Sequence, residues 1–158
     1  MKGFTLIEIL ATLAILTLIS LAVFPNIQPL IGQNQFATDT NQLIRALHLA
    51  RITAINQQKT THLCASNNGI VCTQTKNWSD GYLIMLNDQP LSYFKGPRTN
   101  GELKYTHNHV KFDANGYATG YNGTFYYYNN LLQKQCAIIV NNGGRVRIAK
   151  NSDINEIN

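Results

Sequence analysis

The chain has 158 residues, which is enough for one modest domain in addition to any special segment. Charged residues make up 13% and hydrophobic residues 44% of it, which excludes both a disordered chain and a chain wholly embedded in a membrane. The net charge of +5 favours a polyanionic partner, either nucleic acid or anionic lipid, without choosing between them.

Residues 4–24 form an apolar run that is interrupted by threonines, one serine and Glu8. As a helix this run would be about 31 Å long, which matches the hydrocarbon core of a bilayer. Lys2 precedes the run, so the positive-inside tendency places the N-terminus in the cytoplasm and the residues after Phe24 outside it. A cleaved secretory signal fits poorly, because no small-residue cleavage motif follows. We therefore expect a single transmembrane anchor.

Glu8 conflicts with a simple anchor, since a carboxylate inside an apolar helix is costly in lipid unless it is paired. The stretch GFTLIE, which spans Gly3, Phe4 and Glu8, resembles the type III signal of type IV pilins and pseudopilins. This resemblance implies that residues 1–3 are a leader peptide, that a prepilin peptidase cleaves after Gly3, and that Phe4 is then methylated. It also implies that Glu8 pairs with the N-terminal amine of a neighbouring subunit during filament assembly.

Residues 25–56 are expected to continue the helix as an amphipathic segment. Pro25 and Pro29 should kink or loosen it near its start. Beyond them, apolar residues recur at steps of three, four and seven, which is the helical period. These residues are Phe36, Leu43, Leu47, Ala50 and Ala54. The complete helix would have about 50 residues and a length of about 75 Å, and its outer half needs a surface that covers this stripe.

Residues 57–158 are predicted to form a β-rich head in the periplasm. Short segments rich in β-branched and aromatic residues alternate there with Asn, Gly, Asp and Pro. The segments are TTHLC, GYLIML, LSYF, VKF, TFYYY, CAIIV and RVRI. The sequence therefore predicts the α+β class, with a long N-terminal helix packed on an antiparallel β-sheet. The C-terminal NSDINEIN is polar and is expected to fray.

Further segments extend the resemblance over most of the chain. LHLARITAI, the strand with Cys64, WSDGY, VKFDANG and GRVR are similar, in this order, to segments of the FimT/GspH family of minor pilins and pseudopilins. The resemblance implies the type IV pilin-like fold. It also implies that the inner membrane holds the subunit before other pilin subunits take it into a pilus or pseudopilus.

Cys64, Cys72 and Cys136 would all lie in the periplasm, where disulfides form. Cys64 and Cys72 flank the turn-rich ASNNGIV, and a bridge between them would contribute about 2–3 kcal/mol to stability. We favour this pairing, and a bridge from Cys136 to either of the others is the alternative. Because no CxxC motif or suitable histidine spacing accompanies them, we predict neither a metal nor another cofactor.

No pattern in the sequence indicates catalysis. His107-Asn108-His109 is compatible with part of a metal site, but the sequence identifies no further ligands, and solvated histidines are the preferred interpretation. A nucleophile elbow, a phosphate-cradling loop and paired general-acid carboxylates are all missing. We therefore predict a protein that is not an enzyme.

The segment CAIIV-NNGG-RVRI predicts a hairpin whose turn uses Asn and Gly to reach positive φ. Strand alternation places Arg145 and Arg147 on one face, with Val146 and Ile148 facing the core. Lys150 continues the basic phase, Lys134 is a candidate neighbour across the hairpin, and no acidic residue occurs from position 114 to 152. The result would be a cationic ridge that binds phosphates without sequence preference and with strong salt dependence.

A second interpretation is that basic side chains on an outer strand only prevent its pairing with the edge strand of another sheet. In FimT-like minor pilins, however, a C-terminal G-R-x-R is associated with binding of extracellular DNA during natural transformation. Gly144, Arg145 and Arg147 match that pattern. The resemblance therefore implies a DNA-binding minor pilin. The alternatives are a type II secretion pseudopilin or an assembly-priming minor pilin without DNA binding, and an adhesin-like module for another polyanion.

Overall fold

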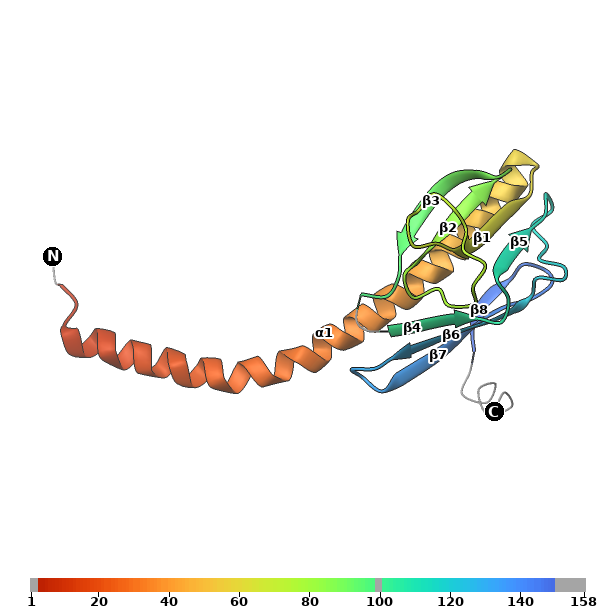
Figure 1. Cartoon of the computed structure of the whole chain (residues 1–158). Coiled ribbons are helices and arrows are strands. Elements are labelled where there is room, and N and C mark those ends of the chain that lie inside the picture. The colour runs from red at the N-terminus through yellow and green to blue at the C-terminus, as the bar shows by residue number, and fades with distance from the viewer. Residues whose placement is uncertain (1–2, 99–100, 150–158) are drawn as a thin grey trace.

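The computed structural model of the chain describes residues 3–98 and 101–149. Within these residues one long helix, α1 (Leu6–Gln57), leads into a head built of eight strands (Figure 1). The expected α+β class is confirmed. Lys150 and the C-terminal NSDINEIN, which entered the sequence-based expectations, lie outside the described residues.

The strands form two four-stranded antiparallel sheets, whereas a single sheet was expected. The first sheet has the order β3-β2-β1-β5 and contains β1 (Thr61–Ala65), β2 (Gly81–Leu86), β3 (Gln89–Lys95) and β5 (His109–Phe112). The second sheet has the order β4-β6-β7-β8 and contains β4 (Gly101–Tyr105), β6 (Gly123–Asn129), β7 (Lys134–Val140) and β8 (Val146–Ile148).

Trp78 separates the two sheets. Its side chain is fully buried, and its ring centroid lies 6.2 Å from Tyr82 of the first sheet and 5.0 Å from Phe125 of the second. The ring centroid of Tyr105, in the second sheet, lies 5.7 Å from that of Trp78. Among the described residues the indole N–H of Trp78 has no hydrogen-bond partner, so its contribution to stability comes from packed aromatic area.

Strand β4 was missed by the sequence analysis, because GELKY has a weak intrinsic preference for strands. Its alternation is nevertheless clear in the structure, with Leu103 and Tyr105 buried and Glu102 and Lys104 exposed. Lys104 Nζ lies 2.7 Å from Glu102 Oε2 on the outer face, and both side chains are more than half exposed. Pairing with β6 therefore determines this strand more than its own composition does.

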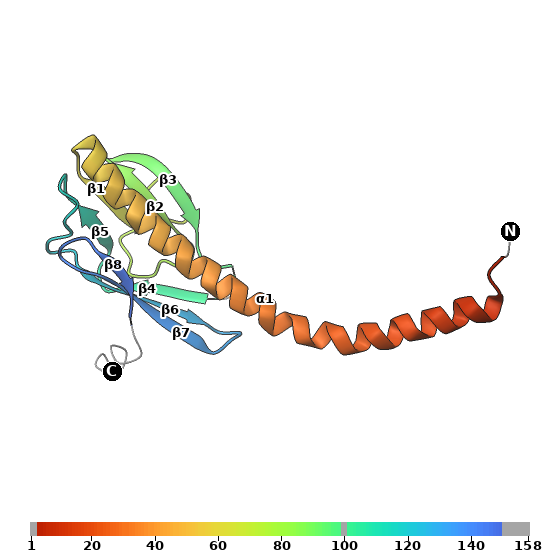
Figure 2. The same ribbon diagram turned by 180° about the vertical axis from the view of Figure 1, so that it is seen from behind.

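The N-terminal part of α1 is exposed along its length as far as residue 20. The helix stays continuous through positions 25 and 29 and curves between this part and the part that carries the head (Figures 1 and 2). Over the part of the chain that the structure describes, no helix combines the length and the apolarity that crossing a membrane requires. The membrane span expected at residues 4–24 stays a prediction.

The C-terminal part of α1 packs on the head through the expected apolar stripe. Leu43, Leu47, Ala50 and Ala54 are at most 2% exposed, and the ring of Phe36 stacks on Tyr127 with a centroid separation of 4.8 Å. The small alanines allow the first sheet to approach closely. Accordingly, Thr61 at the start of β1 donates its hydroxyl hydrogen to the carbonyl oxygen of Ala50 at 2.9 Å.

The turn between β6 and β7 reaches a second point on the helix. A Cβ atom built on Gly32 of α1 would lie 3.0 Å from Cδ2 of Leu132. The lack of a side chain at Gly32 thus makes room for Leu132, and the second sheet contacts the helix one turn before Phe36, where the apolar stripe begins.

Candidate nucleic-acid interface

The segment between β7 and β8 forms the expected hairpin, and residues 141–147 are called the basic turn below. Register pairs Val140 with Val146 and Ile139 with Arg147. Asn141 closes the turn: its carbonyl oxygen accepts the Gly144 N–H at 2.9 Å, and its Oδ1 accepts the Arg145 N–H at 2.9 Å. These bonds fix the turn by local asparagine chemistry, as the sequence pattern indicated.

Arg145 and Arg147 are both exposed, whereas Val146 between them is 9% exposed. The alternation that was expected along this strand is therefore present. Ile148 shares the face of its partner Ile138 but remains 50% exposed, so the expectation that it packs in the core is wrong. The reason is that β8 is the edge strand of its sheet, and nothing in the described part of the chain covers its end.

The structure does not bring Lys134 to the basic turn. Lys134 begins β7 and pairs with Asn129, at the other end of the strand from the turn. Ile139, the partner of Arg147, is five residues further along, which corresponds to about 17 Å. Lys134 is exposed, but it can contribute to the field at the turn only from a distance.

Arg51 of α1 holds the basic turn against the helix. Its Nε donates to the carbonyl oxygen of Gly116 and its Nη2 to the carbonyl oxygen of Gly143, both at 3.0 Å. Gly144 completes the junction, because it has φ +70° and any Cβ there would overlap the carbonyl oxygen of Gly116. Nothing in the sequence of α1 indicates this role of Arg51, because its partners lie 65 and 92 residues further along the chain.

Few acidic groups are available to neutralise this region. In the sequence the nearest acidic residue before the turn is Asp113, and its Oδ1 already accepts the N–H groups of Asn115 and Tyr117 at 2.8 and 3.0 Å. Over the described residues the one salt bridge is that of Lys104 with Glu102, on the second sheet. Asp113 is thus engaged in its own turn, and the side chains of Arg145 and Arg147 are both exposed.

Cys64 and Cys72 form a disulfide with a Cα–Cα distance of 5.6 Å, and this is the pairing that the sequence analysis favoured. Cys136 is a free, half-buried thiol whose Sγ lies 3.6 Å from Thr40 Oγ1. Burial raises the pKa of the Cys136 thiol, so the reactive thiolate is scarce at neutral pH. Over the described residues no group of three or more His, Cys, Asp or Glu side chains is placed to hold a metal ion.

At the N-terminus, Phe4 is 84% exposed and Glu8 forms a helix cap. The carboxylate Oε2 of Glu8 accepts both the N–H and the hydroxyl hydrogen of Thr5, each at 3.2 Å. This is the reciprocal arrangement of a capping box, and it places a negative charge at the positive end of the helix dipole.

Comparison with known proteins agrees with this architecture. Residues 39–144 match the family described as type II transport protein GspH, and residues 1–24 match the prokaryotic N-terminal methylation motif. The type IV minor pilin FimU of Pseudomonas aeruginosa, in crystal form P21, superimposes with a TM-score of 0.61 at 21% identity, covering 76% of this chain and 92% of FimU. The P65 crystal form of FimU superimposes with a TM-score of 0.58 at 22% identity, covering 73% of this chain and 94% of FimU. No curated protein matches the sequence significantly.

These similarities confirm the expected type IV pilin-like fold. The family consists of structural, non-enzymatic proteins, and it implies other pilin subunits and a prepilin peptidase as partners. The methylation motif further implies a membrane-anchored precursor that later enters a pilus or pseudopilus. Because the family match covers more than half of the sequence, the chain belongs to the GspH family of minor pilins and pseudopilins.

Proposed function

We propose that this protein is a minor pilin of a type IV pilus that binds extracellular DNA through its basic turn, for DNA uptake in natural transformation. The observation that carries the proposal is the exposure of Arg145, directly before the edge strand β8, and of Arg147 within it, next to a turn that Arg51 fixes. Guanidinium groups match the geometry of phosphate oxygens, and binding to the backbone needs no base contact.

The proposal includes a path to the filament. The precursor is inserted in the inner membrane once, through residues 4–24, with the head in the periplasm. Cleavage after Gly3 and methylation of Phe4 precede assembly, and Glu8 then pairs with the amine of a neighbouring subunit. Residues 25–56 carry the head, residues 57–158, and no catalytic step is involved.

The residues of this site contribute differently to DNA binding. Arg145 and Arg147 contact phosphates, and Gly144 shapes the turn that presents them. Lys134 adds only to the general positive field, because it lies at the far end of β7. Lys150 is retained as a further phosphate contact on the sequence pattern alone.

The test uses the full-length chain in a non-ionic detergent and a fluorescent duplex DNA of arbitrary sequence at low salt. Replacing both arginines, Arg145→Ala with Arg147→Ala, is expected to weaken binding about equally for different sequences. The slope of log affinity against log salt should fall by about 1 for each arginine. The matched control is Lys95→Ala with Arg98→Ala. It removes two exposed charges at and just after the end of β3, an edge strand of the first sheet, and should keep the slope. Wild-type binding no tighter than that of the arginine variant would refute the proposal.

A type II secretion pseudopilin is the second candidate, and the match of residues 39–144 to the GspH family favours it. In that role the basic turn would contact other subunits or none, and the full-length chain would not bind DNA in the same titration. A third outcome is tighter binding to heparin than to DNA at equal charge concentration, which would indicate an anionic polysaccharide as the natural partner.

A further inference from the structure

The outer face of the first sheet, which is the face turned away from α1, carries a hollow of about 320 Å³ that the proposed function does not use. We call it the outer hollow. It is lined mainly by His62, Cys64, Cys72, Met85, Asp88 and His109. The disulfide forms part of its wall, so the loop between Cys64 and Cys72 cannot move away from the sheet.

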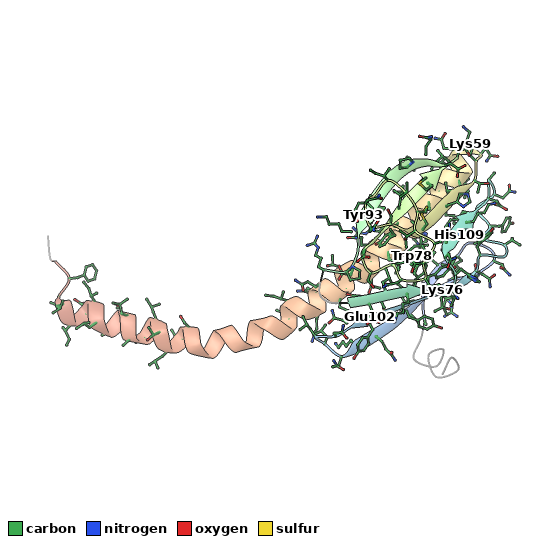
Figure 3. All side chains as sticks on the ribbon, in the orientation of Figure 1. Lys59, Lys76, Trp78, Tyr93, Glu102 and His109 are labelled. Carbon is green, nitrogen blue, oxygen red and sulfur yellow. A yellow bond between two sulfur atoms is a disulfide. The ribbon has the colours of Figure 1, made fainter. Side chains whose placement is uncertain are left out.

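Strand register explains why basic groups gather at this hollow. His62 of β1 is paired with Lys111 of β5, and Cys64 is paired with His109. Directly paired residues share a face, as do residues two apart, so His62, His109 and Lys111 all project from the outer face. The rings of His62 and His109 are 5.8 Å apart between centroids. Figure 3 shows His109 on this side of the head.

The surroundings of both imidazoles are polar and mostly cationic. His62 faces Lys111 and His109 of β5, and Asp88 in the turn after β2 is the one carboxylate that acts on it. His109 faces Lys111 and His107, and its ring lies 4.8 Å from that of Tyr121. Lys111 Nζ in turn lies over the Tyr121 ring, at 5.9 Å from its centroid.

This environment makes the charge of the hollow depend on pH. Burial first, and then the charges of Lys111 and His109, lower the pKa of His62 below its usual 6.5. Burial, Lys111 and His107 lower the pKa of His109 in the same direction. The lowered pKa values favour the neutral form of both rings at neutral pH. Acidification below these pKa values adds positive charge to the hollow, and a bound anion would favour the uptake of protons.

Strand β5, which carries His109 and Lys111, leads from the outer hollow toward the basic turn. Strand β5 ends at Phe112, and the turn that follows reaches Gly116, whose carbonyl oxygen any side chain at Gly144 would overlap. Figures 1 and 2 both show β5 beside the hairpin end of β7 and β8. A duplex that contacts the basic turn has phosphates spaced every few ångströms, so its backbone can continue toward β5.

We propose that the outer hollow is a second anion-binding site for the phosphates of the same DNA, and that it binds them most tightly when His62 and His109 carry protons. This inference rests on the proposed function, since it assigns a further part of the nucleic-acid footprint. The ligand is a phosphodiester, held by two imidazolium groups and Lys111. A metal fits less well, because Lys111 faces both histidines and repels a cation.

The test measures DNA binding by the full-length chain in non-ionic detergent at pH 7.5 and pH 5.5. Wild type should bind about fivefold tighter at pH 5.5, with a salt slope steeper by about 1 to 2. The variant His62→Gln with His109→Gln should lose the gain between pH 7.5 and pH 5.5. His48→Gln removes an exposed histidine of α1 and should keep the gain.

Each result separates the two proposals. A full gain in the double histidine variant would overturn the outer hollow and leave the basic turn standing. If Arg145→Ala with Arg147→Ala binds as wild type does while the histidine variant loses binding, the basic turn fails and the hollow stands. No binding by wild type at either pH would overturn both. A pH-dependent gain seen with heparin and absent with DNA would assign the hollow to a polysaccharide instead.

A second measurement tests occupancy directly. The imidazole NMR signals of His62 and His109 should move on addition of DNA at pH 5.5, and Lys111→Gln should reduce the shift. Inorganic phosphate at the same phosphate concentration should move them far less, because it lacks the attachment to the basic turn. Equal shifts with both ligands would mean a site for free phosphate and would overturn its assignment to DNA.

Discussion

Arg51 Nη2 lies 3.0 Å from the carbonyl oxygen of Gly143, a residue 92 positions later in the chain. The same guanidinium donates to Gly116 through Nε, so one side chain of α1 joins the helix to two separate turns of the head. These hydrogen bonds come from a charged donor and lie in a half-buried junction, where they are stronger than those of a fully exposed group. The basic turn is thus supported by the helix that leads to the filament.

Arg51→Met should lower the free energy of unfolding by about 1–3 kcal/mol, because two carbonyl oxygens lose a charged donor. Arg45→Met is the matched control, since Arg45 is an exposed arginine of the same helix. Urea unfolding of the full-length chain can be followed by the fluorescence of Trp78, the one tryptophan in the sequence. DNA affinity should also fall in Arg51→Met. Equal stability of the two variants would contradict the role given to Arg51.

Gly144→Ala should destabilise the chain by at least about 2 kcal/mol and weaken DNA binding, although it removes no charge. Its φ of +70° disfavours any side chain, and the added Cβ would overlap the Gly116 carbonyl oxygen. Gly143→Ala is the control, since its Cβ would meet nothing closer than Asn141 Oδ1 at 3.5 Å. That variant should stay within about 0.5 kcal/mol of wild type. Similar losses in both variants would show that the φ of Gly144 is not decisive.

Removal of the disulfide, by Cys64→Ser with Cys72→Ser, should cost about 2–3 kcal/mol by the same Trp78 assay. The loop that it closes is short, so the entropic gain is at the low end of the usual range. A reducing agent should lower the stability of wild type and leave the double variant unchanged. Cys136→Ser, which touches no bridge, should retain the sensitivity to reduction. Loss of that sensitivity would argue for a different pairing.

The stability of the folded chain should decrease between pH 7 and pH 5. His62 and His109 have a lowered pKa in the folded state, so the unfolded chain binds more protons in this interval, which lowers its free energy relative to that of the folded chain. His62→Gln with His109→Gln should flatten this part of the stability–pH curve. His48→Gln should leave the curve as it is in wild type. A wild-type curve that is already flat would contradict the lowered pKa values.

Glu8→Gln separates two roles of this residue. The glutamine oxygen can still accept from Thr5, so the helix cap survives, whereas the negative charge is lost. If pairing with a neighbouring amine drives assembly, Glu8→Gln and Glu8→Ala should both insert in the membrane and both fail to enter filaments. Fractionation and recovery of sheared filaments measure the two steps. Normal incorporation of Glu8→Gln would leave capping as the role of Glu8.

The helix was predictable because its signals are local. The stripe that includes Leu47 and Ala54 follows a period set by helix geometry alone, and the buried face matches it. The sheets were only partly predictable. Strand alternation predicted that Arg145 and Arg147 share a face. The division into two sheets was not predictable, because it depends on pairing between distant segments. Strand β4 belongs to this class, since its place is set by β6.

The site shows the same division. The turn around Gly144 was predictable, because the four adjacent residues NNGG favour it. The distance of Lys134 from the turn follows instead from the register of β6 with β7. The role of Arg51 depends on partners 65 and 92 residues away, and no spacing rule within α1 indicates them. The outer hollow likewise needs the pairing of β1 with β5 before its histidines become neighbours.

The head contacts the helix from Gly32, which faces Leu132, to the Arg51 junction, and the apolar stripe packs on the head between them. Nineteen residues of helix separate them, which is about 28 Å of a stiff rod. Tension applied along the stalk would therefore move this part of the helix and the head together as one rigid body, and the head would turn with the stalk. The direction in which Arg145 and Arg147 project would then be fixed relative to the axis of this part of the helix.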